Sequence, residues 1–98
     1  MTSKDEILTK LRETKARLTG LGVRQVGLFG SYLRNEQDSG SDIDLLVDFE
    51  PGQENFDNFM AVYDLFEETF RNEKIEVVTL NGLSPHIGPY ILKEVAYV

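Results

Sequence analysis

Short apolar segments with strand-like composition alternate with helical segments along this chain. The strand-like segments lie at residues 23–29, 42–49 and 74–80, and each carries β-branched residues. Strands that alternate with helices favour an open sheet covered by helices. We therefore predict an α/β (α+β) fold with a small mixed sheet of about three strands. The expected helices occupy residues 3–18, 32–36, 56–72 and 90–94.

Capping residues and apolar spacing mark two of these helices. Ser3 and Glu6 have the spacing of a capping box at the start of the first helix, and Asn55 is a suitable N-cap for the helix at residues 56–72. Along that helix, aromatic residues and one methionine recur at helical spacing. We expect this stripe to pack on the sheet rather than to line a ligand pocket, because a domain this small needs it for its core. The stripe consists of Phe56, Phe59, Met60, Tyr63, Phe66 and Phe70.

Length and composition limit the kinds of site that the chain can hold. Its 98 residues suit one domain, residues 1–98. The lack of cysteine excludes disulfides and thiolate metal sites, and a single histidine excludes a multi-histidine zinc site. A net charge of −7 argues against broad contact with a nucleic-acid backbone, so we expect no direct nucleic-acid binding.

The apolar segments are short. None of them approaches the ~20 residues that cross a bilayer, so we expect no membrane contact. The first ten residues are polar and lack the apolar stretch of a signal peptide. The expected compartment is therefore the cytoplasm.

Asp42 and Asp44 form the sharpest chemical feature. Residues two apart in a strand project from the same face, about 6.6 Å from each other. Two carboxylates at that distance repel by roughly 2.5 kcal/mol at an effective dielectric constant of ~20. A cation between them removes this cost, and Mg²⁺ prefers oxygen ligands while keeping positions open for substrate phosphate. The alternative is a solvated pair on an exposed edge strand.

Gly30 and Ser31 stand where a strand is expected to turn into a helix. Glycine lets the backbone approach a bulky anion closely, and free amides at a helix start favour phosphate. The Ser31 hydroxyl can add a hydrogen bond. The alternative is a simple turn with Ser31 as the N-cap. An anion site beside a carboxylate pair, however, supplies both halves of a metal–triphosphate site.

Glu76 is a third acid, in the last expected strand. It shares a face with Val78 and Leu80, which are apolar, and a charged residue on such a face is unusual unless it has a partner or a function. It could complete the metal site or act as the general base that deprotonates an attacking hydroxyl. The alternative is that Glu76 pairs with Lys74 or is exposed to solvent.

These residues together resemble a known family. Gly30-Ser31, ten intervening residues and Asp42-Ile43-Asp44 are similar to the signature of the DNA polymerase beta-like nucleotidyltransferases. The whole chain most resembles the smallest branch of that superfamily, the minimal nucleotidyltransferases, also called MNT or MntA antitoxins. Residues 27–32, 34, 36 and the tail at 83–92 fit the same pattern. Glu76 departs from it, because the third acid of the family is commonly aspartate.

The resemblance implies a nucleotidyltransferase fold and a role for each site residue. Gly30 and Ser31 would hold the nucleotide phosphates. Arg34 would touch phosphate too, although pairing with Glu36 or Asp38 explains it equally well. Two Mg²⁺ ions are implied as cofactors. Their ligands, and with them the catalytic residues, would be Asp42, Asp44 and Glu76.

The implied reaction transfers AMP from ATP to an acceptor hydroxyl and releases pyrophosphate. For the antitoxin members, the acceptor is a tyrosine of a partner HEPN-domain toxin, an RNase that the modification silences. The main alternative is an inert antitoxin that neutralises such a partner by contact alone. DNA polymerisation or repair is disfavoured by the acidic charge. The apolar segment at residues 87–98 either packs on the sheet or forms a surface for a partner or a homo-oligomer.

Overall fold

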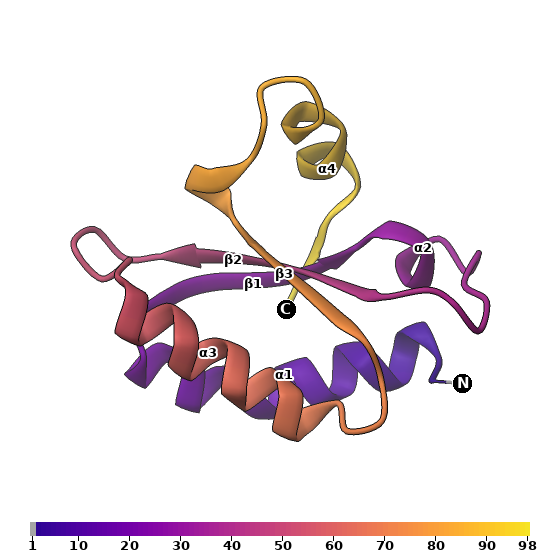
Figure 1. Cartoon of the computed structure of the whole chain (residues 1–98), viewed down its shortest axis with the longest axis horizontal. Helices are drawn as coiled ribbons and strands as arrows, with labels where there is room; N and C mark the ends of the chain where they lie inside the picture. Colours follow the sequence, from indigo (N-terminus) through magenta and orange to yellow (C-terminus); the bar gives the residue numbers. More distant parts are fainter. Residues whose placement is uncertain (1) are drawn as a thin grey trace.

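The computed structural model describes residues 2–98 as one layered α/β unit (Figure 1). None of the helices in this range is long and apolar enough to cross a membrane. Along the chain the elements are α1 (Lys4–Gly20), β1 (Val23–Phe29), α2 (Gly30–Leu33), β2 (Ile43–Phe49), α3 (Phe56–Thr69), β3 (Ile75–Thr79), the 3-10 turn η1 (Leu80–Gly82), α4 (Gly88–Glu94) and β4 (Ala96–Tyr97).

The four strands form one mixed sheet in the order β3-β2-β1-β4. Strand β1 runs antiparallel to both β2 and β4, and β2 runs parallel to β3. The predicted α/β class and mixed sheet are confirmed, but the expected strand number of about three omits β4. This strand has only two residues, Ala96 and Tyr97, which are too few to give a period-two pattern.

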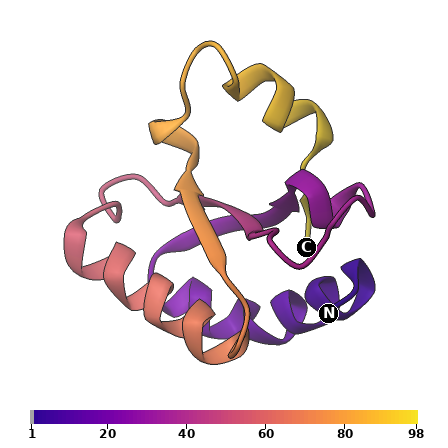
Figure 2. The same ribbon diagram turned by 45° about the vertical axis from the view of Figure 1, so that its right-hand side comes forward.

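Helices α1 and α3 lie against one face of the sheet, and α4 lies on the opposite side (Figures 1 and 2). The core fills the space between the two long helices and the sheet. On β2, the residues with odd numbers from 43 to 49 point into this core. Their neighbours in the core include Ile7, Leu11 and Leu18 of α1, Val26 and Leu28 of β1, and Val62, Leu65 and Phe66 of α3.

The opposite face of the sheet is also covered in part. Leu46 of β2 is fully buried there, and Asp48 is buried beside Arg24, which donates a 2.8 Å hydrogen bond to it. Gly27 is needed on this face, because a Cβ atom at Gly27 would lie 2.6 Å from Val95 Cγ2. The tail therefore packs on the sheet through Val95 and β4, as the first alternative predicts. Ile87, Tyr90, Leu92 and Tyr97 nevertheless stay exposed.

Both predicted helix caps are confirmed. The Ser3 side chain accepts from the Glu6 N–H, and the Asn55 side chain accepts from the Asn58 N–H. The helix predicted at residues 56–72 ends earlier, at Thr69, and Asn72 takes a left-handed φ of 70°.

The aromatic stripe of α3 is only partly in the core. Phe66 and Phe70 are buried and Phe59 packs against the core, but Phe56 is 76% exposed and Met60 is also exposed. The residues that α3 buries are Val62, Leu65 and Phe66. The buried side of the helix is thus turned by about one residue position, or 100°, from the centre of the stripe. Packing against the sheet, and not the aromatic spacing, sets the orientation of this helix.

Candidate active site

Strand β1 passes directly into α2 at Gly30, which has a φ of 81°. A Cβ atom here would lie 2.8 Å from Asp44 Cγ and closer still to Asp44 Oδ2. Only glycine therefore allows the turn to pack against this carboxylate. The helix expected at residues 32–36 begins earlier and ends at Leu33, and Asn35 follows with a left-handed φ of 57°. Its N-cap is Phe29, so the alternative role of Ser31 as an N-cap is wrong.

Strand pairing places Asp44 between the other predicted site residues. In the antiparallel β1–β2 pair, Asp44 lies opposite Phe29, the residue before Gly30. In the parallel β2–β3 pair, Asp44 lies opposite Glu76. Asp42 is two residues earlier, just before β2 begins. The sheet thus brings together the glycine turn and the acids that the sequence analysis singled out.

The neighbouring acids and partial burial both raise the pKa of Asp44. Burial raises its pKa most, followed by a hydrogen bond to Glu76 and by the charges of Glu76 and Asp42. Arg34 opposes these effects, and the net pKa of Asp44 is about 7. A cation bound beside Asp44 would offset the repulsion between carboxylates that contributes to this rise. The donor set consists of carboxylate oxygens, which fits a hard ion such as Mg²⁺.

The acids are close without forming a complete metal cage. Among residues 2–98, no group of three or more His, Cys, Asp or Glu side chains is arranged to hold one ion. Asp44 and Glu76 are neighbours across the β2–β3 pair, and the charges of both Glu76 and Asp42 help to raise the pKa of Asp44. Glu76 is exposed and, within the described chain, forms no ion pair with Lys74. Of the two forms of the alternative for Glu76, pairing with Lys74 is therefore wrong, and exposure to solvent is confirmed.

Arg34 is held between two carboxylates. Its Nε donates to Glu36 at 2.8 Å, and its NH1 group donates to both oxygens of Glu94 at 2.8 and 3.0 Å. The predicted pairing with Glu36 is confirmed. Asp38 instead accepts from the Gly40 N–H in the loop that leads to β2. Glu94 was missed, because the sequence places it 60 residues from Arg34.

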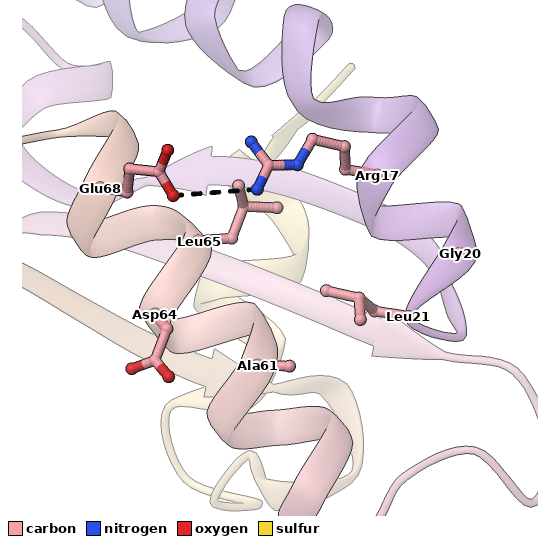
Figure 3. A pocket seen from close by; sticks show the side chains of 7 residues that line it. All are labelled: Arg17, Gly20, Leu21, Ala61, Asp64, Leu65 and Glu68. Atoms are coloured by element: carbon pink, nitrogen blue, oxygen red, sulfur yellow. Dashed lines mark ion pairs between the residues drawn. The ribbon is translucent and has the colours of Figure 1, made fainter.

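Two of the surface cavities are large enough to compare with the position of the acid cluster. One of about 390 Å³ adjoins the start of β2 and is lined by residues that include Tyr32, Ser41 and Lys74. Another, of about 510 Å³, lies between α1 and α3, where Arg17 and Glu68 form a 3.8 Å ion pair (Figure 3). None of the predicted site residues lines either of these two cavities. Strand pairing and the close packing of Gly30 on Asp44, and not a cavity, place the candidate site at the Gly30–Asp44–Glu76 cluster.

The sequence and the fold match known proteins along almost the whole chain. The family model that matches is described as a nucleotidyltransferase domain and covers residues 5–98. The chain is 35% identical to the protein adenylyltransferase MntA of Thermococcus cleftensis over 101 aligned positions, which cover 100% of this chain and 98% of the relative. It is 40% identical to a Methanocaldococcus jannaschii protein provisionally named a protein adenylyltransferase, over 74% of this chain and 76% of the relative.

A solved structure provides a comparison of the fold. The chain superposes with a TM-score of 0.81 on a structure provisionally described as a minimal nucleotidyltransferase, covering 97% of this chain and 95% of the other. The two sequences are only 24% identical, so this likeness speaks for the fold alone. With the family model and the relatives, it confirms the resemblance found in the sequence.

Proposed function

From the premise that the chain belongs to the nucleotidyltransferase domain family, we propose that it transfers AMP from ATP to a hydroxyl group on another protein. Membership makes the chain a nucleotidyltransferase. The relative from Thermococcus cleftensis is named a protein adenylyltransferase, which supports a protein as the acceptor. The observation that carries the proposal is the position of Asp44, packed against Gly30 on one side and paired with Glu76 on the other.

Each residue of the cluster has a part in this reaction. Asp42 and Asp44 would hold Mg²⁺, with Glu76 as a further ligand or as the general base. When bound, two such ions would neutralise the triphosphate and lower the pKa of the acceptor hydroxyl. Gly30 and Ser31 would present the turn to the phosphates, and the Ser31 hydroxyl would donate to a phosphate oxygen.

The covalent step balances without a further reactant. The acceptor oxygen forms a bond to the α-phosphorus of ATP, and the bond from that phosphorus to the bridging oxygen breaks. Pyrophosphate leaves with the electron pair, and the hydroxyl proton passes to Glu76 or to water.

For the acceptor we propose a tyrosine of a HEPN-domain toxin, as the resemblance to MntA antitoxins implies. Exposed apolar side chains at Ile87, Tyr90 and Leu92 offer a surface for such a partner. Homo-oligomerisation through the same residues would compete with that contact. Both proposals concern one region of the molecule, the end of the chain around α4.

A second candidate function is neutralisation by contact alone. It is favoured by one observation: among residues 2–98, the acids of the cluster are not arranged as a metal site of three ligands. Glu76 also replaces the aspartate common in the family. If the chain acts by contact alone, the Asp42→Asn variant should bind and neutralise the partner as well as the unmodified chain does.

The test combines the purified chain, a HEPN-domain partner, Mg²⁺ and ATP labelled on its α-phosphate. We expect label on the partner and pyrophosphate in solution, and neither with Asp42→Asn or Asp44→Asn. Asp64→Asn is the matched control, because Asp64 is an exposed acid on α3 that lines only the cavity between the helices. Label transfer by folded Asp42→Asn and Asp44→Asn proteins at the rate of the control would refute the proposal.

A further inference from the structure

Glu94 is an acidic residue in an electrostatically unfavourable place. It is the last residue of α4, where the helix dipole favours cations over carboxylates. Its side chain is nevertheless only 26% exposed. A charge that is unfavourable locally and half-buried needs partners from elsewhere in the fold, because an unpaired charge there would lose its solvation.

Those partners come from the glycine turn. Gly27 pairs with Tyr97 and Leu28 with Ala96 in the antiparallel β1–β4 ladder. Continuing this register brings Glu94 beside Gly30. The Gly30 N–H donates to Glu94 Oε2 at 3.1 Å, and the Arg34 NH1 group donates to both oxygens of the same carboxylate.

One carboxylate thus fixes both ends of α2. The bond to Gly30 holds the residue with a φ of 81° at the start of the helix, and the bonds to Arg34 hold the residue just after its end. The Gly30 N–H is already used by Glu94, so Ser31 is the residue of the turn that remains to face a ligand. Arg34 also acts on Asp44 through its charge, so its placement matters to the acid cluster.

We propose that Glu94 is a positioning residue of the nucleotide site, which acts through the Gly30 N–H and Arg34 to hold the turn in its triphosphate-binding shape. This inference rests on the proposed function. Two effects of the Glu94 charge oppose each other: it fixes the turn, and it repels a phosphate. The bonds to Arg34 offset much of its negative charge, so the loss of the fixed geometry is the larger effect when Glu94 is removed.

The test measures the dissociation constant of Mg-ATP with a fluorescent ATP analogue, which needs no acceptor protein. We expect Glu94→Ala to weaken binding about tenfold, or ~1.4 kcal/mol. Glu94→Gln keeps an oxygen for the Gly30 N–H but loses the charged pair with Arg34, so it should weaken binding only about threefold. The exposed Glu67→Gln on α3 is the control and should bind like the unmodified chain.

A double-mutant cycle separates positioning from a general loss of structure. Reversible partial unfolding would raise the apparent dissociation constant only by the inverse of the folded fraction, which circular dichroism measures, so a tenfold loss in a variant that stays mostly folded is due to positioning. We expect Arg34→Ala and Glu94→Ala to be non-additive, because they remove the same contact. If Glu94→Ala does not fold, the threefold effect of Glu94→Gln carries the test.

Two results would overturn the inference. Equal affinity of the Glu94 and Glu67 variants would show that the turn needs no support from α4. Tighter binding by Glu94→Gln would show that the carboxylate competes with phosphate. If the unmodified chain fails to bind Mg-ATP at all, the proposed function itself is wrong, and the role of Glu94 is refuted with it.

Discussion

Asp44 is the residue on which the proposed chemistry depends most. It sits on the face of β2 opposite the core, between the glycine turn and Glu76. The fold keeps it half-buried among carboxylates, an arrangement that costs stability and that functional sites commonly retain. Because its pKa lies near 7, its protonation changes around neutral pH, and a cation would compete with the proton for the same oxygens.

The raised pKa of Asp44 predicts an effect of pH on stability in metal-free solution. The folded state binds the proton more tightly than the unfolded state, whose pKa is near 3.8. The resulting destabilisation is absent below that pH, grows as the pH rises towards 7 and is complete above it. Relative to the unmodified protein, Asp44→Asn should therefore raise the free energy of unfolding more at pH 8 than at pH 5. The expected difference between the two pH values is about 1–2 kcal/mol after allowance for solvent screening.

Urea unfolding of both proteins at several pH values measures this difference. Subtracting the two curves removes the contributions of the other acids. A difference between the curves that does not change between pH 5 and 8 would show that Asp44 is ionised throughout.

Gly30 gives a second prediction at the residue scale. In Gly30→Ala the new Cβ atom is strained by the left-handed φ and also clashes with the Asp44 carboxylate. In Gly52→Ala it is strained only by a φ of 79°, because the space around it is open. The left-handed conformation alone costs about 1–2 kcal/mol. We expect Gly30→Ala to lose more stability than Gly52→Ala in urea unfolding, and to lose Mg-ATP binding as well. Equal losses in both variants would mean that the contact with Asp44 is not tight.

At the scale of elements, helices and strands with a periodic pattern or a capping residue are predictable from the sequence, whereas very short elements are not. The range of β1 is correct at both ends, and both helix caps are correct, because each has a local signal. Strand β4 has two residues and no period, and its place beside β1 depends on a glycine 69 positions earlier in the chain than Ala96. The sequence also predicts that Asp42 and Asp44 lie together, because strand alternation places them on one face. The position of Glu94 is not predictable in this way, because only the folded sheet brings it to Gly30.

The contact of the tail with β1 predicts the effect of a side chain at Gly27. A Cβ atom there would lie 2.6 Å from Val95 Cγ2 and 2.9 Å from the Ala96 carbonyl oxygen. Gly27→Ala should push β4 away and destabilise the protein by about 1–3 kcal/mol. Hydrogen exchange reads this directly, because the Val98 N–H donates to the Val26 carbonyl. We expect faster exchange at Val98 in this variant and no change in Gly20→Ala, whose surroundings are open. Unchanged protection of Val98 would contradict the contact.

At the scale of the whole molecule, one face of the sheet forms the core and the other carries the candidate site. The face under α1 and α3 holds most of the core, and the C-terminal segment with α4 lies over the other face (Figure 2). Asp44 is on this second face, because it alternates with the core residues Ile43 and Leu45, and Gly30 packs against it. Changes to the site acids should therefore leave the fold intact. The overall charge of −7 also bears on function, because it disfavours a nucleic-acid substrate.

This charge predicts that DNA does not bind. In fluorescence anisotropy with a labelled duplex at 50 mM salt, we expect no binding at micromolar protein, since few phosphates could be neutralised. Salt-sensitive binding under these conditions would instead favour the DNA polymerisation or repair alternative.

The central claim is that Asp42 and Asp44, beside the turn at Gly30, bind a metal–triphosphate. Calorimetric titration with a non-hydrolysable ATP analogue, with and without Mg²⁺, tests it most directly. We predict binding that requires Mg²⁺ and falls at least about tenfold, or ~1.4 kcal/mol, in Asp44→Asn but not in Asp64→Asn. Binding of equal strength in all three proteins, or binding indifferent to Mg²⁺, would contradict the claim.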